Sequence, residues 1–116
     1  MEKKLLAEVE GCHIRQVSSI DHYAIVKLKI YTIDADVVLF ENHCSFERLP
    51  EKFVIGVEKA VQDYASKYNL SGIEVCLLDG NYHQYDSSEM DFNIATLKAL
   101  FELFQPKKEK DIGKFA

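Results

Sequence analysis

The sequence of 116 residues lacks the glycine-rich motifs that hold nucleotide phosphates. It contains neither a G-x-x-x-x-G-K-[ST] phosphate loop nor a G-x-G-x-x-G fingerprint, whose closely spaced glycines let backbone N–H groups approach a phosphate. Its five glycines are scattered singly along the chain. We therefore do not expect this chain alone to bind or hydrolyse GTP or ATP.

Long hydrophobic runs are also missing. No apolar stretch approaches the roughly 20 residues that a membrane-spanning helix needs. The N-terminal residues 1–6 lack the apolar central segment of a secretory signal peptide. We therefore expect a cytoplasmic protein that does not associate with membranes.

Basic residues are fewer than acidic ones, with 14 Lys and Arg against 19 Asp and Glu and a net charge of −5. Broad nonspecific binding to nucleic acid needs a basic surface that neutralises phosphates, so this balance argues against it. A small contact made by one tip of the molecule remains compatible with the composition.

Cysteines are too few and too scattered for a disulfide framework. Cys12, Cys44 and Cys76 stand in apolar or strand-like contexts, which predicts buried, reduced thiols. The pairs Cys12-His13 and His43-Cys44 could lie on neighbouring strands, but adjacent strand residues point to opposite faces. Only two or three ligands would then converge, where zinc takes four, so we expect no metal site and no other cofactor.

Hydrophobic periodicity predicts three strands, a helix, a fourth strand and a second helix. Residues 24–33 form the clearest strand, because Val26, Leu28 and Ile30 alternate with polar or amphipathic residues. A polar break at 18–22 and a turn at 34–36 flank it. The other strands are expected at about 7–16, 37–40 (a short buried strand continuing toward residue 44) and 73–78.

Two amphipathic helices are expected to cover one face of this sheet. The first begins at Pro50 and ends near Asn69 and Gly72. The second stops at Pro106. Its expected apolar stripe consists of Met90, Ile94, Leu97, Phe101 and Phe104. The prediction is an α+β two-layer sandwich of order β-β-β-α-β-α, forming one domain over 1–116 with a core at about 7–105 and a charged tail at 106–116.

A polar segment, Asp79 to Met90, joins the fourth strand to the second helix. Asp86 and Glu89 have the spacing of a capping box, in which an oxygen acceptor is followed three residues later by a Glu that reaches back. We therefore predict that Asp86, Ser87 and Glu89 shape this loop by capping the second helix.

Tyr82 and His83 stand at the apex of the segment, where capping does not require them. Both rings can stack on unpaired RNA bases, and a histidine can also hydrogen-bond to phosphate. Alternatively, Tyr82 packs on the base of its own loop and the segment is an ordinary surface loop. Catalysis by His83 with Asp86, Ser87 or Ser88 is disfavoured, because an exposed tip lacks a water-excluding cleft. No catalytic residues are expected.

Residues 79–92 resemble a stretch of domain IV of bacterial elongation factor G, which reads G-S-Y-H-x-V-D-S-S-E-[ML]-A-F. The matching positions are Gly80, Tyr82, His83, Asp86, Ser87, Ser88, Glu89, Met90 and Phe92. Residues 49–61 are similar to the family's I-P-x-x-[YF]-[IV]-x-A-V-[DE]-K-G-[IV], and residues 70–75 to its L-A-G-Y-P-V. Val9-Glu10-Gly11, Arg15-Gln16 and Tyr23 fit V-E-G…R-Q…Y, so the resemblance covers about Val9 to Phe104.

This resemblance implies two helices on a four-stranded sheet with an unusual left-handed βαβ crossover. It also implies a domain that mimics the anticodon arm of tRNA and reaches the decoding site of the small ribosomal subunit with two tip loops. One tip loop would contribute Asn81, Tyr82, His83 and Gln84. The other, Gln16 to Tyr23, would contribute Gln16 together with Arg15 beside it.

The first tip loop departs from the family pattern, R-Q-S-G-G-R-G-Q-Y-G. Here residues 15–24 read R-Q-V-S-S-I-D-H-Y-A, without any glycine. Ile20 replaces a basic residue and Asp21 adds an acid. Because glycine serves where a backbone turns sharply or closely approaches a ligand, this loop is remodelled.

Two functions are compatible with these features. The first is a non-catalytic, translation-factor-like module that contacts the small ribosomal subunit or RNA through its tip loops. The alternative is a protein-interaction or self-associating module without ribosome binding, which the acidic charge and the remodelled loop favour. The GTPase domain of the family is not in this sequence, which is either a free-standing domain-IV-like protein or a piece of a longer one.

Overall fold

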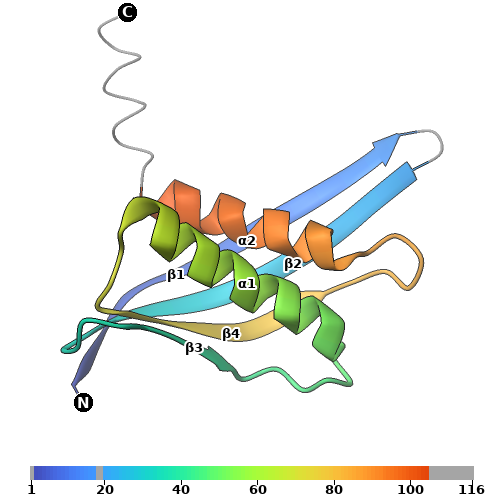
Figure 1. Cartoon of the computed structure of the whole chain (residues 1–116). Coiled ribbons are helices and arrows are strands. Elements are labelled where there is room, and N and C mark those ends of the chain that lie inside the picture. The colour runs from blue at the N-terminus through green and yellow to red at the C-terminus, as the bar shows by residue number, and fades with distance from the viewer. Residues whose placement is uncertain (1, 18–19, 105–116) are drawn as a thin grey trace, which may run out of the picture.

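The computed structural model describes residues 2–17 and 20–104, in which two helices cover one face of a four-stranded sheet (Figure 1). In chain order the elements are β1 (Lys3–Val17), β2 (Ile20–Ile33), β3 (Val38–Asn42), α1 (Glu51–Tyr68), β4 (Ile73–Asn81) and α2 (Glu89–Phe104). The predicted α+β sandwich and its β-β-β-α-β-α order are confirmed. Neither helix in the described ranges is long and apolar enough to cross a membrane.

The strands lie in the order β1-β2-β4-β3. β1 and β2 form a long antiparallel hairpin, β4 pairs antiparallel with β2, and β3 pairs parallel with β4 through the α1 crossover. The hairpin is longer than predicted, since the expected polar break at residues 20–22 belongs to β2. Backbone pairing continues there because ladder hydrogen bonds do not require apolar side chains. Ser18 and Ser19 lie outside the described residues.

The core lies between the sheet and the two helices. Val26, Leu28 and Ile30 on β2 are 0% exposed, as the alternation predicted. Pro50 immediately precedes α1, and Asn69 ends it in the left-handed conformation with φ 56°. An Asn tolerates that conformation better than most residues, so the predicted helix end is confirmed.

β3 is an edge strand and not the buried strand that the sequence predicted. It begins at Val38, and its residues alternate between half-buried and exposed. β3 has a neighbour on one side only, and Leu39 is 37% exposed because it alternates with Val38 and Phe40, which pack against the core. A short apolar run does not distinguish a central strand from an edge strand.

The apolar stripe predicted for α2 is right only in part: Leu97 and Phe104 pack against the core, but the most buried face of the helix is a different one. The residues of α2 that are buried are Asp91, Phe92, Ala95, Thr96, Ala99 and Leu100. Met90 is instead 64% exposed and Phe101 38% exposed. Small side chains face the sheet because α2 passes very close to Gly11 of β1, where a Cβ would lie 2.0 Å from the Ala95 carbonyl oxygen. Pro106, the predicted stop, lies outside the described residues.

Two of the three thiols are buried as predicted, and one is not. Cys44 and Cys76 are buried, and burial raises the pKa of Cys76 to about 11. Cys12 is exposed. It alternates with the buried Gly11 and His13 along β1, so its side chain lies on the opposite face of the strand.

Candidate functional site

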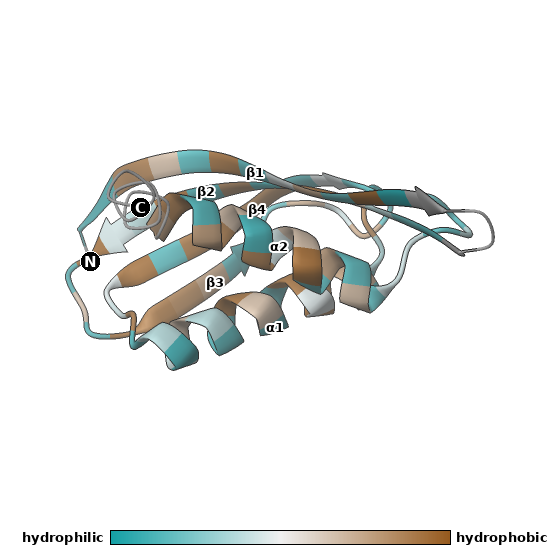
Figure 2. Cartoon of the chain, turned by 90° about the horizontal axis from the view of Figure 1, so that it is seen from above, coloured by the Kyte–Doolittle hydropathy of each residue, from teal (hydrophilic) through white to brown (hydrophobic). Residues whose placement is uncertain are grey.

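The β1–β2 hairpin extends beyond the helices, and the loop from β4 to α2 runs beside it (Figures 1 and 2). Three hydrogen bonds join the two segments or tighten the loop. The Tyr23 N–H donates to the Asp86 carbonyl oxygen at 3.1 Å. The Ser87 hydroxyl donates to the Tyr23 carbonyl oxygen at 2.5 Å and accepts from the His83 N–H at 2.8 Å. The two predicted tip loops therefore adjoin in their described parts, which we together call the tip (residues 15–17, 20–23 and 81–88).

His83 is held in place by an aromatic stack. Its ring lies parallel to the Tyr23 ring, with centroids 3.9 Å apart and an interplanar angle of 6°. Its Nδ1 lies 3.4 Å from Asp86 Oδ2, and half of its side chain is exposed. One ring face is therefore covered by β2, while part of the imidazole remains open to a ligand.

Tyr82 packs onto the body of the domain. Its ring centroid lies 5.3 Å from that of Phe53 on α1, and the side chain joins the edge of the core. This is the alternative in which Tyr82 packs on the base of its own loop. A ring in this position supports the loop and offers little surface for stacking on a base.

Tyr85 is the tip residue that the sequence reasoning missed. It is 90% exposed, the most exposed of the large hydrophobic side chains in the described residues. The family pattern has Val at this position. An aromatic residue inside an otherwise polar turn was the signal that could have identified it, because Tyr is enriched at binding interfaces.

The other predicted contacts are spread over the tip. Gln84 is exposed, and Asn81 is half-buried at the end of β4, opposite Ile25 of β2. Arg15 is exposed on β1, and the side chain of Gln16 lies outside the described part of the structure.

Charge at the tip is mixed. Arg15 on β1 is accompanied by Asp21, which lies near the start of β2, and by Asp86 in the second loop. This arrangement presents no concentrated positive charge, in line with the acidic composition. Any nucleic acid contact here has to depend on stacking and hydrogen bonds more than on phosphate neutralisation.

The capping box of α2 lies two residues later than predicted. The Ser88 N–H donates to Asp91 Oδ2 at 3.0 Å, and the Asp91 N–H donates to Ser88 Oγ at 3.1 Å. The predicted pair, Asp86 and Glu89, is wrong as a cap because Asp86 is engaged with β2 and His83. Asp86 and Ser87 do shape the loop, but by attaching it to the hairpin.

The two residue pairs considered as metal ligands cannot meet, because β1 and β3 lie at opposite edges of the sheet. His13 lies instead beside His22 and Asp91, and His43 beside Glu41 and Cys76. Burial lowers the pKa of His13, and the nearby Lys98 ammonium acts in the same direction. These clusters bring together residues that are far apart in the sequence.

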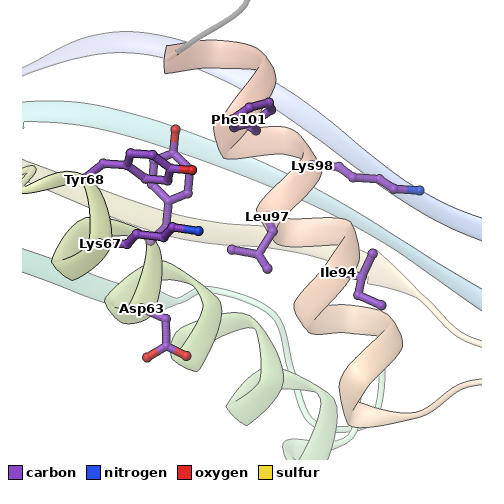
Figure 3. A pocket seen from close by; sticks show the side chains of 8 residues that line it. Asp63, Lys67, Tyr68, Ile94, Leu97, Lys98 and Phe101 are labelled. Carbon is purple, nitrogen blue, oxygen red and sulfur yellow. The ribbon is translucent and has the colours of Figure 1, made fainter.

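A groove of about 370 Å³ runs between the outer surfaces of α1 and α2 (Figure 3). Ile94, Leu97 and Phe101 line it, which accounts for most of the apolar stripe that was predicted to face the sheet. Tyr64 also lines it, and its hydroxyl is buried without a hydrogen-bond partner among the described residues. Burial raises the pKa of Tyr64.

This two-layer α+β domain, with two adjoining tip loops and the Y-H-x-x-D-S-S-E sequence in one of them, has the architecture of a translation-factor domain. Residues 2–106 match the family model for elongation factor G, domain IV. The chain is 34% identical over 111 residues to Elongation factor G 2 of Bdellovibrio bacteriovorus, covering 88% of this chain and 16% of that protein. The chain belongs to the elongation factor G domain IV family.

A crystal structure from Thermus thermophilus has the same fold, with a TM-score of 0.69 and 24% sequence identity. The match covers 84% of this chain and 16% of that one. The chain thus spans about one sixth of the length of the curated relative and of the solved structure that it matches.

Proposed function

We propose that this chain is a non-catalytic module whose tip contacts RNA of the small ribosomal subunit. Membership of the elongation factor G domain IV family supports this proposal, since the family implies ribosome contact for the whole factor. The proposal also implies a cytoplasmic protein, because translation takes place there. The contacting residues would be Asn81, Tyr82, His83, Gln84, Arg15 and Gln16, as the sequence predicted, with the addition of Tyr85.

The stack of His83 on Tyr23 is the observation that carries the proposal. A ring already fixed by stacking and by the Ser87 hydrogen bond loses little conformational entropy when it binds. Its exposed edge can donate to a phosphate or a base, while the fully exposed Tyr85 beside it offers a stacking surface. Tyr82 would act mainly as the support beneath them.

The mixed charge of the tip sets the expected salt dependence. Each neutralised phosphate contributes a slope of roughly −0.7 to −0.9 in log K against log salt. Because Arg15 is offset by Asp21 and Asp86, only one or two phosphates should be neutralised. We therefore expect binding that weakens only modestly as salt rises.

The test is co-sedimentation of the purified protein with ribosomes and with separate small subunits across a salt series. Wild type is compared with His83→Ala, Tyr85→Ala and Tyr68→Ala. Tyr68 is the matched control, since it is an exposed aromatic residue at the C-terminal end of α1, away from the tip. Loss of a base stack costs about 1–3 kcal/mol, so either tip variant should bind roughly 5- to 150-fold more weakly.

Circular dichroism on each variant checks that the domain remains folded. Equal pelleting of wild type, His83→Ala and Tyr85→Ala would refute the role of the tip. No pelleting of wild type even at low salt would refute ribosome binding itself. The protein-interaction or self-associating function would then become the better hypothesis, to be tested by light scattering.

A further inference from the structure

Three potential metal ligands from three elements converge where the β1–β2 hairpin meets the start of α2. His13 lies on β1, His22 on β2 and Asp91 in the first turn of α2. Asp91 Oδ1 lies 2.8 Å from His22 Nδ1 and 3.9 Å from His13 Nε2. One donor atom from each residue lies within 4.8 Å of the others. His13 and Asp91 lie outside the tip, whereas His22 belongs to it and is the neighbour of Tyr23 on β2.

The donor set suits a borderline divalent cation such as Zn²⁺. Two imidazole nitrogens and a carboxylate oxygen bind zinc at about 2.0–2.2 Å, so tetrahedral geometry separates donors by about 3.3 Å. The observed 2.8 Å and 3.9 Å lie on either side of this value, and small side-chain rotations would equalise them. Three protein ligands would leave a fourth position for water or an anionic oxygen.

The carboxylate of Asp91 is both buried and oriented. Asp91 is 2% exposed, and its second oxygen accepts the Ser88 N–H, which directs Oδ1 toward the two histidines. Hydrogen bonds of this kind typically orient the first ligands of a metal. A divalent cation would place a full opposite charge beside this buried carboxylate.

Two of the three ligands are also departures from the family pattern. That pattern has Gln where this chain has His22, and Ala where it has Asp91. Neither Gln nor Ala is a usual zinc ligand. The two replacements are 69 residues apart in the sequence, yet their side chains meet at 2.8 Å.

The positive charges of Lys98 and Arg15 near His13 would repel a cation at this position. Lys98 points away from the helix groove and toward β1, and its Nζ lies 3.1 Å from His13 Nδ1 (Figure 3). For His13 Nε2 to bind a metal, the neutral ring has to carry its proton on Nδ1, so Lys98 can no longer donate there. The Lys98 side chain is exposed and can rotate into solvent. It would therefore lower the affinity for a metal without blocking the site.

We propose that His13, His22 and Asp91 form a Zn²⁺-binding site that fastens the β1–β2 hairpin to the start of α2. The neutral imidazoles and the carboxylate bind the ion without any redox change. Because the ligands come from three elements, the ion would fix the direction in which the hairpin extends. This proposal does not depend on ribosome binding, and it departs from the sequence-based expectation of no metal site.

The test is isothermal titration of the full chain with Zn²⁺ alone at neutral pH, with Co²⁺ absorption as a second readout of coordination by nitrogen and oxygen. We expect one ion per chain. His22→Gln and Asp91→Asn should each weaken binding by at least about tenfold, as losses around metal sites typically do. Both changes nearly preserve side-chain size, and the amide oxygen introduced by Asp91→Asn can still accept the Ser88 N–H. Lys98→Gln should instead tighten binding, an increase that nonspecific damage to the fold would not produce.

His43→Gln is the matched control, because His43 belongs to the other candidate cluster, with Glu41 and Cys76. It should leave the Zn²⁺ affinity unchanged. Absence of a binding isotherm for wild type at millimolar Zn²⁺ would overturn the proposal. So would binding that survives His22→Gln but is lost in His43→Gln, since the ion would then occupy the second cluster.

Discussion

Gly11 is the residue at which β1 and α2 approach most closely, and Gly11→Ala tests that approach directly. A Cβ at this position would lie 2.0 Å from the Ala95 carbonyl oxygen, 2.9 Å from its carbonyl carbon and 3.0 Å from Ala99 Cβ. Ordinary contact begins near 3.4 Å, so strand and helix would have to separate by roughly 1.4 Å. The nearest atom is backbone, which cannot rotate out of the way.

The expected loss of unfolding free energy follows from two opposing effects. Overpacking of this kind typically costs about 1–3 kcal/mol, and the rigid backbone contact places Gly11→Ala near the upper end. Alanine restricts the unfolded chain more than glycine does, which returns about 0.5–1 kcal/mol. The net loss should be about 2 kcal/mol, equivalent to a decrease in Tm of roughly 5–12 °C for a domain of this size.

Urea unfolding of wild type, Gly11→Ala and Gly80→Ala provides the measurement. Gly80 is the matched control, because its nearest neighbour would be the end of the buried Leu49 side chain, Cδ2 at 2.8 Å, and its nearest backbone atom would be the Ile25 carbonyl oxygen at 3.2 Å instead of 2.0 Å. Gly80→Ala should therefore cost less than half as much as Gly11→Ala. A loss below about 0.5 kcal/mol for Gly11→Ala, or equal losses for the two variants, would refute the close approach of β1 and α2.

Two further predictions concern thiols and acid stability. One thiol, that of Cys12, should react with Ellman's reagent in the native protein, at a rate slowed by its raised pKa, while Cys44 and Cys76 should react only after unfolding; two reactive thiols before unfolding would contradict the burial. Arg48 donates to the Asp79 carboxylate and holds the pKa of that carboxyl below its ordinary value. The pair therefore stabilises the fold at neutral pH, and this stabilisation is lost as the pH falls below about 4 through the lowered pKa. Because both side chains are substantially exposed, the gain over Asp79→Asn should be small at pH 6 and should shrink as the pH falls from 4 toward the lowered pKa in urea unfolding; a constant difference would exclude the charge effect.

Hydrophobic periodicity predicted the buried residues of β2 but not the most buried face of α2, because it detects large apolar side chains only. β2 lies inside the sheet with helices on one face, so Val26, Leu28 and Ile30 are large, apolar and evenly spaced. The buried face of α2 instead contains Ala95 and Thr96, whose small size fits the gap over β1 but gives a weak hydrophobic signal. The sequence shows which side chains are apolar, but not how closely two backbones approach.

The sequence indicated which residues form the tip, but not how their side chains are arranged. Two overlapping capping registers were available, Asp86 with Glu89 and Ser88 with Asp91. The second is used because α2 begins at Glu89, immediately after Ser88, while the backbone carbonyl of Asp86 accepts the Tyr23 N–H from a position 63 residues away in the chain. The same long-range docking places His83 on Tyr23, which no local pattern indicates.

This docking links the tip to the proposed metal site through the hairpin. Tyr23 supports His83 from one face of the second loop, and His22, its immediate neighbour on β2, contacts Asp91 at the start of α2. Any ion that fixes His22 therefore also restricts Tyr23 and the ring stacked on it. If both proposals hold, Zn²⁺ should strengthen ribosome association of wild type but not of His22→Gln, because only the wild-type hairpin would be fastened before binding.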